Sequence, residues 1–232
     1  MKIEILRDAA AVAARGARWL AAAAREAVAA RGRFALAVSG GRTPWRMLRA
    51  LAEEDVPWGQ VHLFQVDERV APAGDPDRNL THIRESLLGQ VPLPPGHLHP
   101  MPVEEADLRA AAARYQRQLE AVAGAPAVLD AVHLGLGADG HVASLVPGDP
   151  VLAVAGADVA LAGRYGGHAR MTLTYPALER ARSVLWVVTG AEKAAALRRL
   201  LDGDPSIPAG RLRPAQALVL ADRGAAGLAT GP

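Results

Sequence analysis

The sequence contains no cysteine in its 232 residues. Disulfide bonds, thiolate metal sites and cysteine nucleophiles are therefore excluded, and the absence fits a reducing compartment, so we expect a cytoplasmic protein. Aromatic residues are also scarce, at 4% of the chain. The formal net charge is only +2, and the basic residues are scattered through alanine-rich stretches without interleaved aromatics. We therefore expect no nucleic-acid partner, although a small anionic ligand is compatible with this balance.

Long uncharged hydrophobic runs are absent as well. The first residues, Met1–Arg7, lack the apolar core of a signal peptide, and arginines and a glutamate interrupt the apolar stretch 9–30. We therefore expect no targeting segment, no membrane span and no membrane partner. Half of the residues are hydrophobic and 22% are charged, which is ordinary globular usage. We expect a single domain over residues 1–232, in a monomer or a small homo-oligomer.

Apolar runs alternate with helix-forming segments along the chain. We expect helices at 9–31, 43–54, 79–88, 104–122 and 192–201, and strands at 34–38, 61–66, 131–136, 170–174, 183–188 and 217–220. Gly32 is placed to end the first helix. This alternation predicts an α/β fold, with a doubly wound, mostly parallel, Rossmann-like sheet and helices on both faces. Ligands of such sheets bind beyond the carboxyl ends of the strands, where the polar turns of this sequence lie.

One of these turns, Ser39-Gly40-Gly41-Arg42-Thr43, lies between a predicted strand and a predicted helix. Its small residues expose backbone N–H groups ahead of a helix N-terminus, as phosphate sites require, and Arg42 adds a charged donor. The alternative is a tight turn in which Thr43 only caps the helix. The spacing of a Walker loop is absent. Ala37 occupies the first-glycine position of a nucleophile elbow, which disfavours Ser39 as a nucleophile.

Two further charged positions follow predicted strands. Asp67-Glu68-Arg69 comes directly after the apolar strand 61–66, where Arg69 can hold a phosphate or a developing oxyanion. The alternative is a solvated loop with an internal ion pair. Lys193, near the start of the helix after Thr189-Gly190, can reach a phosphate in the same crevice, or it can be an ordinary surface lysine.

The segment Leu134–Pro147 carries the strongest sign of chemistry, because an apolar run ends there in three glycines, an aspartate and a histidine. We expect His141 to act as a general base and Asp139 to orient its imidazole. The alternative is a hydrogen-bonded histidine that serves only the turn. We expect the three glycines to make room for a ligand.

The same glycines, Gly135, Gly137 and Gly140, match the spacing of a dinucleotide fingerprint. Asp139, however, would place a negative charge in the pyrophosphate turn, and Pro147-Gly148 ends the segment before a long helix can follow. We therefore expect no nicotinamide cofactor. The other histidines show no metal-ligand spacing, so we expect no metal site. They are His62, His82, His97, His99, His133 and His168.

Together these segments resemble the 6-phosphogluconolactonases, hydrolases of the pentose phosphate pathway that share their fold with glucosamine-6-phosphate deaminase. Val38–Pro44 is similar to the family's S-G-G-S-T-P loop, and Asp67–Val70 with the later Asn79 is similar to its D-E-R-x-V…N segment. Leu134–Pro147 resembles the signature L-G-x-G-x-D-G-H-x-A-S-L-F-P. The order is completed by Arg170–Pro176, Gly190–Lys193, Pro208 and Asp222.

The chain departs from the family pattern at Arg42, where serine is usual, and at Val146, where phenylalanine is usual. Deaminase relatives carry A-F-N-E-P after D-G-H, and the glutamate serves ring opening. This chain has Ala143–Pro147, without an acid, which favours the lactonase. An amino-sugar phosphate deaminase or isomerase and a non-catalytic sugar-phosphate sensor remain alternatives.

The resemblance implies hydrolysis of 6-phospho-D-glucono-1,5-lactone without a cofactor. His141 would activate water, Arg69 or Arg170 would stabilise the anionic intermediate, and Arg42 or Lys193 would assist in binding phosphate. The implied catalytic residues are His141, Asp139 and Arg69. The implied substrate- and phosphate-binding residues are Ser39, Gly40, Gly41, Arg42, Thr43, Asp67, Arg170 and Lys193.

Overall fold

Two β-sheets organise the protein in the computed structural model, which describes residues 1–228. The strands are β1 (Lys2–Leu6), β2 (Phe34–Val38), β3 (Val61–Gln65), β4 (Asp67–Arg69), β5 (Leu98–His99), β6 (Ala131–Leu134), β7 (Val159–Tyr165), β8 (His168–Leu173), β9 (Val184–Val188) and β10 (Ala217–Asp222). The α-helices are α1 (Ala9–Arg31), α2 (Arg42–Ala52), α3 (Asn79–Ile83), α4 (Leu108–Ala123), α5 (Tyr175–Glu179), α6 (Ala194–Leu201) and α7 (Pro208–Arg211). Single turns of 3₁₀ helix lie at Trp58–Gln60, Pro95–His97, Pro150–Ala153 and Ala191–Lys193, and a π-helical turn at Arg84–Leu88. Residues 229–232 of the expected domain lie outside the described part.

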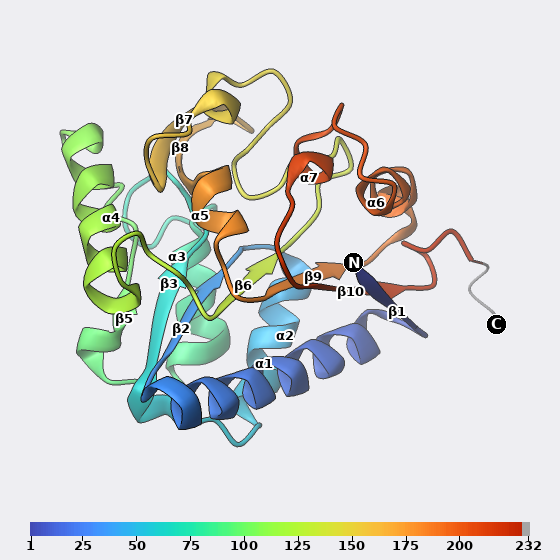
Figure 1. Cartoon of the computed structure of the whole chain (residues 1–232), viewed down its shortest axis with the longest axis horizontal. Helices are drawn as coiled ribbons and strands as arrows, with labels where there is room; N and C mark the ends of the chain where they lie inside the picture. The colour runs from blue at the N-terminus through green and yellow to red at the C-terminus, as the bar shows by residue number, and fades with distance from the viewer. Residues whose placement is uncertain (229–232) are drawn as a thin grey trace.

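The larger sheet has the strand order β1-β10-β9-β6-β2-β3-β5, and every pair in it is parallel. From β2 the chain moves outward to β3 and β5, then returns to the other side of β2 with β6 and continues to β9 and β10 (Figure 1). The strand order therefore reverses between β2 and β6. In open α/β sheets a ligand crevice forms at such a reversal, beyond the carboxyl ends of the strands.

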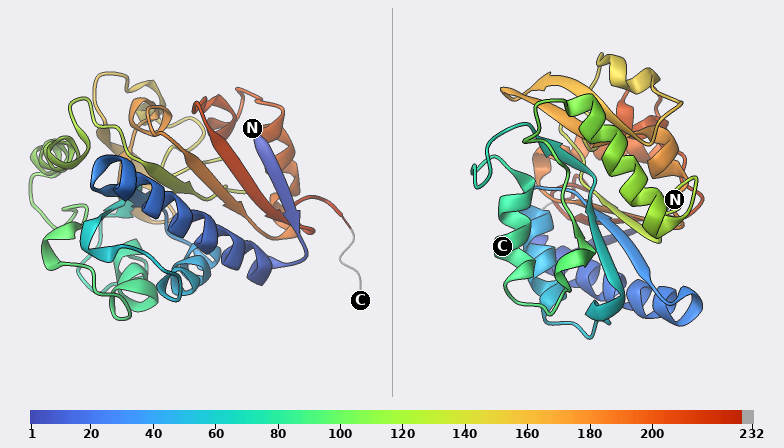
Figure 2. Two further views of the ribbon diagram at one scale, coloured as in Figure 1. Left: turned by 60° about the horizontal axis from the view of Figure 1, so that its bottom comes forward. Right: turned by 90° about the vertical axis from the view of Figure 1, so that its left-hand side faces the viewer.

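The two faces of this sheet are covered by different layers (Figures 1 and 2). Phe34, Leu36 and Val38 of β2 pack in one core cluster with α1 and α2, whereas Ala35 and Ala37 belong to the cluster that contains residues of α4, α5 and the small sheet. Successive side chains of a strand point to opposite faces, so β2 contributes to both cores. The doubly wound α/β fold expected from the sequence is confirmed.

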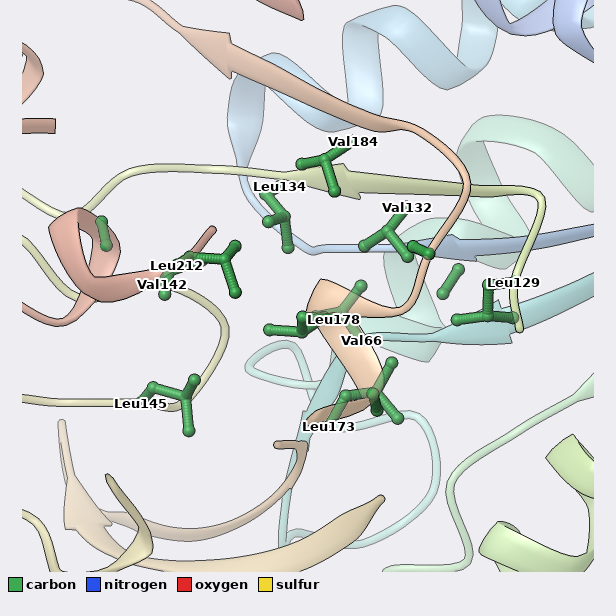
Figure 3. Packing of buried hydrophobic residues seen from close by; sticks show 14 of the residues in the cluster. Val66, Leu129, Val132, Leu134, Val142, Leu145, Leu173, Leu178, Val184 and Leu212 are labelled. Carbon is green, nitrogen blue, oxygen red and sulfur yellow. The ribbon is translucent and has the colours of Figure 1, made fainter. Parts of the chain in front are cut away.

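The second core cluster extends from the sheet into the loops of the predicted site. Val132 and Leu134 of β6 lie near Leu178 of α5, and the same cluster contains Val142 and Leu145 from the segment that follows β6 (Figure 3). Val142 and Leu145 are fully buried. The segment that follows His141 is thus anchored in the core.

The smaller sheet is antiparallel, in the order β4-β8-β7. Strand β4 consists of Asp67-Glu68-Arg69, so the alternative of a solvated loop at these residues is wrong: Arg69 pairs with Arg170, and the Asp67 and Glu68 side chains are buried. The sequence patterns did not predict β1, β4, β5 or β7. Three charged residues have no apolar alternation, and β4 exists only because β8 pairs with it.

The first helix begins and ends at the expected residues for identifiable reasons. The Asp8 carboxylate accepts the N–H of Ala11 at 2.8 Å, and Gly32 adopts φ = 73° at the C-terminus. The helix expected from residue 104 begins instead at Leu108, because Asp107 accepts the N–H groups of the first turn. None of the helices within residues 1–228 is long and apolar enough to cross a membrane.

Candidate active site

A cavity of about 520 Å³ opens where the strand order reverses, beyond the carboxyl ends of β2 and β6. Residues far apart in the sequence meet there because parallel strands end at the same edge of the sheet. Every residue predicted to act on or bind a ligand lines this cavity except Asp139, which lies behind His141. Those lining it are Ser39, Gly40, Gly41, Arg42, Thr43, Asp67, Arg69, His141, Arg170 and Lys193.

His141 is paired with Asp139 at the cavity. The imidazole Nδ1 lies 2.6 Å from Asp139 Oδ1, which also accepts the backbone N–H of His141 at 3.2 Å. Burial acts to raise the pKa of Asp139, but the nearby charge of His141 and its hydrogen bonds outweigh it and hold that pKa below its usual value. An ionised carboxylate only accepts hydrogen bonds, so Nδ1 carries the proton in the neutral imidazole and Nε2 is left as a basic nitrogen.

Two of the three glycines around this pair are needed because neighbouring protein atoms leave no space for a Cβ. A Cβ on Gly137 would overlap the His141 ring, and Gly140 has φ = 85° with Ile207 against its α-carbon. Only Gly135 has open space around it, and it lines the cavity. The expectation that all three glycines make room for a ligand is therefore wrong for Gly137 and Gly140. No helix follows within residues 135–149, which supports the exclusion of a dinucleotide site.

The Gly-rich turn leads directly into α2, whose N-cap is Gly41 with φ = 122°. Thr43 is not the cap, because its hydroxyl lies 2.5 Å from the Thr189 hydroxyl and so joins the turns after β2 and β9. A Cβ on Gly40 would overlap the Asn79 side chain. The turn therefore brings its backbone close to neighbouring elements while the first turn of α2 faces the cavity.

Ser39 joins this Gly-rich turn to His133 of strand β6. Its N–H donates to His133 Nδ1 at 3.3 Å and its hydroxyl donates to the His133 carbonyl at 3.1 Å. Burial lowers the pKa of His133 to about 3, so its imidazole is a neutral acceptor. Both donors of Ser39 are used within the protein, and its hydroxyl faces a carbonyl rather than a base, which argues further against a nucleophile.

The short strand β4 contributes a fully buried carboxylate, Glu68. Glu68 accepts the backbone N–H groups of Arg69 and Asn79 at 2.8 Å and of Leu80 at 2.9 Å, and it lies 3.1 Å from the guanidinium of buried Arg78. The Arg69 side chain donates in turn to the Asn79 amide oxygen. A single carboxylate therefore sets the backbone of two residues that line the cavity.

Asp67 organises the opposite side of the same strand. Its carboxylate accepts the Ser144 hydroxyl at 2.6 Å and lies 3.7 Å from the guanidinium of Arg170. Burial and the neighbouring charge of Arg69 lower the pKa of Arg170, yet a guanidinium stays charged in proteins. Asp67 thus joins the segment after His141 to the small sheet, a contact that the sequence did not indicate.

The turn after β9 positions Lys193. Gly190, with φ = 101°, donates its N–H to both carboxylate oxygens of Asp222 at 3.1 Å. Arg46 and Glu192 also line the cavity and were not predicted, although Arg46 follows Arg42 by one helical turn. The basic lining residues are Arg42, Arg46, Arg69, Arg170 and Lys193, against the acidic Asp67, Glu192 and Asp222. This excess of positive charge suits an anionic ligand.

The remaining histidines lie outside the cavity. His62 stacks on His97 with ring centroids 4.0 Å apart and contacts His99 at the β5 edge of the large sheet. Within residues 1–228, no group of three or more His, Asp or Glu side chains is arranged to hold a metal ion.

Comparison with known proteins places these features in a family. The family model described as glucosamine-6-phosphate isomerases/6-phosphogluconolactonase matches residues 7–221. The chain is 39% identical over 201 residues to a 6-phosphogluconolactonase of Synechocystis sp., covering 84% of this chain and 83% of that protein. It is 38% identical to a 6-phosphogluconolactonase of Mycobacterium tuberculosis, covering 97% and 96%.

A solved structure agrees with the sequence comparisons. The crystal structure of 6-phosphogluconolactonase from Thermotoga maritima superposes with a TM-score of 0.86 at 27% identity, covering 95% of this chain and 99% of that one. The likeness therefore extends over nearly the whole chain.

Proposed function

Because this chain belongs to the glucosamine-6-phosphate isomerase/6-phosphogluconolactonase family, we propose that it hydrolyses 6-phospho-D-glucono-1,5-lactone to 6-phospho-D-gluconate in the oxidative pentose phosphate pathway. The observation that carries the mechanism is the Asp139–His141 pair, 2.6 Å apart at a cavity rich in positive charge. A carboxylate-oriented imidazole is suited to activating water, and the basic lining is suited to a sugar phosphate.

The proposed reaction starts with water at the C1 carbonyl. His141 Nε2 accepts a proton as the water oxygen bonds to C1, and negative charge develops on the carbonyl oxygen. Arg69 and Arg170, adjacent in the small sheet, are the cations available to stabilise it. The bond from C1 to the ring oxygen then breaks, and the imidazolium returns its proton to that oxygen, which leaves as an alcohol.

The phosphate of the substrate is assigned to the other side of the cavity. The N-terminal turn of α2 presents backbone N–H groups there, with Arg42, Arg46 and Lys193 around it. A contact of Ser39 with the ligand, the cytoplasmic location, the oligomeric state and the single domain stay predictions.

The segment after His141 bears on the choice between lactonase and deaminase. Residues 142–148 contain no acidic residue. Ser144, which lies in this segment, is fully buried and donates to Asp67 rather than facing the cavity. A deaminase that opens an amino-sugar ring needs an acid at the reacting centre, and this segment does not supply it.

Replacing His141 by asparagine tests the assignment of the base. Asparagine keeps a polar side chain of similar reach but cannot accept a proton, so we expect kcat to fall roughly 10²-fold or more, the scale of general-base catalysis. The measurement is release of acid from freshly prepared lactone in a pH-stat, corrected for spontaneous opening. Binding of 6-phosphogluconate, measured by calorimetry, is expected to stay close to that of the unaltered protein.

The same assays separate the alternatives. Unchanged kcat in His141→Asn would refute the role of His141. Ammonia release from glucosamine 6-phosphate by the unaltered protein would indicate a deaminase. Binding of 6-phosphogluconate without turnover above the spontaneous rate would indicate a sugar-phosphate sensor.

A further inference from the structure

Tyr165 reaches the candidate active site from a part of the chain that none of the site motifs includes. It ends strand β7, and the turn Gly166-Gly167, with φ of 59° and 87°, reverses the chain into β8. Its side chain is 38% exposed, although it is a large aromatic residue in a chain that has only three tyrosines. Its contacts, rather than its burial, account for its position.

The hydroxyl of Tyr165 contacts the carboxylate that orients His141. It donates to Asp139 Oδ2 at 3.4 Å, while the other oxygen, Oδ1, holds the His141 imidazole. Burial and the neighbouring negative charge of Asp139 raise the pKa of Tyr165, so the phenol keeps its proton and remains a donor. The two oxygens of Asp139 therefore have different partners, which limits rotation of the carboxylate.

The ring and the backbone of Tyr165 contact two more site residues. The ring meets the His141 imidazole edge to face, with centroids 5.2 Å apart and an interplanar angle of 63°. Arg170 donates from Nε and Nη2 to the Tyr165 carbonyl at 3.2 and 3.0 Å, and its Cζ lies 5.3 Å from the ring centroid. The general base, its carboxylate and one candidate oxyanion cation all meet at this one residue.

We infer that Tyr165 is a positioning residue for the hydrolysis. Its hydroxyl and ring hold the Asp139–His141 pair in place, and its carbonyl holds Arg170 at a set separation from that pair. The inference rests on the proposed function. A base and a cation that act on the same carbonyl must be held within a fraction of an ångström, and the two here come from different sheets and loops.

Replacing Tyr165 by phenylalanine removes the hydroxyl and keeps the ring. We expect kcat to fall about threefold to tenfold, the order that loss of one long, solvent-exposed hydrogen bond produces, with KM unchanged. Without the phenol proton, the Asp139 charge acts more strongly on the imidazole. The acidic limb of the kcat/KM profile therefore moves to higher pH, which a merely structural role would not produce. Tyr165→Ala, which also removes the ring, is expected to lose more of kcat than Tyr165→Phe.

Arg164→Ala is the matched control, because Arg164 lies on the same hairpin and, among residues 1–228, its side chain donates only to the Gly167 carbonyl, at 2.9 Å. We expect its kcat, KM and pH profile to match those of the unaltered protein. Thermal melting of all variants verifies that they are folded.

Two results would overturn the inference: a Tyr165→Phe variant with unaltered kcat and pH profile, or one in which KM rises while kcat stays constant.

A measurement without substrate separates this inference from the proposed function. The ¹⁵N resonances of the His141 ring report its protonation directly, and in Tyr165→Phe we expect their titration to move to higher pH, as the acidic limb of the activity profile does. If the protein proves inactive on the lactone, the proposed function fails, while this spectrum still tests the contact.

Discussion

Glu68 illustrates, at the scale of one residue, how a group that never meets the ligand controls the site. Its carboxylate is fully buried, yet its oxygens accept hydrogen bonds from Gln65, Arg69, Asn79 and Leu80. A buried charge is tolerated only where donors and an opposite charge surround it. The same donors that make Glu68 tolerable are the backbone groups that place Arg69 and Asn79 at the cavity.

Replacing Glu68 by glutamine tests whether its buried charge holds Arg69 and Asn79 at the cavity. The side chain keeps its shape but loses the charge opposite Arg78. One carboxylate oxygen is replaced by an NH₂ group, which faces N–H donors and cannot accept from them. We expect the free energy of unfolding to fall by about 3 kcal/mol or more, as for other broken buried pairs, and kcat/KM to fall as Arg69 shifts. Urea unfolding monitored by circular dichroism measures the first effect.

Glu104→Gln is the control, because Glu104 also pairs with Arg78, at 2.8 Å, but its side chain is 51% exposed. Water can replace a half-exposed carboxylate, and Arg78 keeps its pair with Glu68, so this variant is expected to lose much less stability than Glu68→Gln. Equal losses in the two variants would contradict the role assigned to Glu68.

The elements differ in how their ends are determined. Helix α1 has an apolar face and a side-chain cap at Asp8, and its C-terminus is a glycine in the left-handed region. Helix α2 lacks a side-chain cap, and its exposed N–H groups face the cavity instead. An uncapped helix N-terminus is a binding element for anions, so the missing cap is consistent with the proposed phosphate site.

Gly32→Ala tests what ends α1. Gly32 has φ = 73° and no atom within 4 Å of where a Cβ would lie, so the substitution adds backbone strain without a clash. We expect the free energy of unfolding to fall by about 1 kcal/mol. Gly59→Ala is the matched control, since Gly59 has equally open space but no left-handed φ. A loss in Gly59→Ala as large as in Gly32→Ala would show that strain at φ is not the cause.

At the scale of the whole molecule, two histidines, the half-buried His99 and the fully buried His133, are held in their neutral form. His99 stacks on Phe64 with ring centroids 4.2 Å apart, and burial, with the nearby His62 and His97, lowers its pKa to about 4. His133 beneath Ser39 has its pKa lowered to about 3 by burial. In the unfolded chain these groups titrate near 6.5. The unfolded state therefore binds more protons than the folded state below that pH.

We accordingly expect full stability above about pH 6.5 and a progressive loss of the free energy of unfolding as the pH falls toward about 4. His99→Phe keeps a ring against Phe64 and removes one titrating group. Its free energy of unfolding should therefore fall less steeply with decreasing pH. The difference in slope corresponds to at most about one fewer proton bound on unfolding. Urea unfolding at several pH values between these limits measures the slopes, and identical slopes in the two proteins would exclude His99 as a contributor.

Much of this architecture could be predicted from local patterns. Apolar runs located the central strands, Gly32 marked the end of α1, and polar turns after 38, 66 and 136 marked one edge of the sheet. Strands β1, β4, β5 and β7 were missed, because β1, β5 and β7 lie at sheet edges and β4 has three charged residues. Such strands form because a neighbour pairs with them, which no local pattern records.

The sequence by itself determined the family, the parallel α/β fold and ten of the residues that line the cavity, because spaced glycines and charges after apolar strands are local signals. Only the tertiary structure decided how these residues act together. The β7–β8 hairpin places Tyr165 against the Asp139–His141 pair and Arg170 against Tyr165. Glu68 is buried and holds the backbone of Arg69 and Asn79. Gly137 makes room for the His141 ring rather than for a ligand. Most of these contacts join residues from separate elements, and their energies depend on burial that exists only once both sheets have formed.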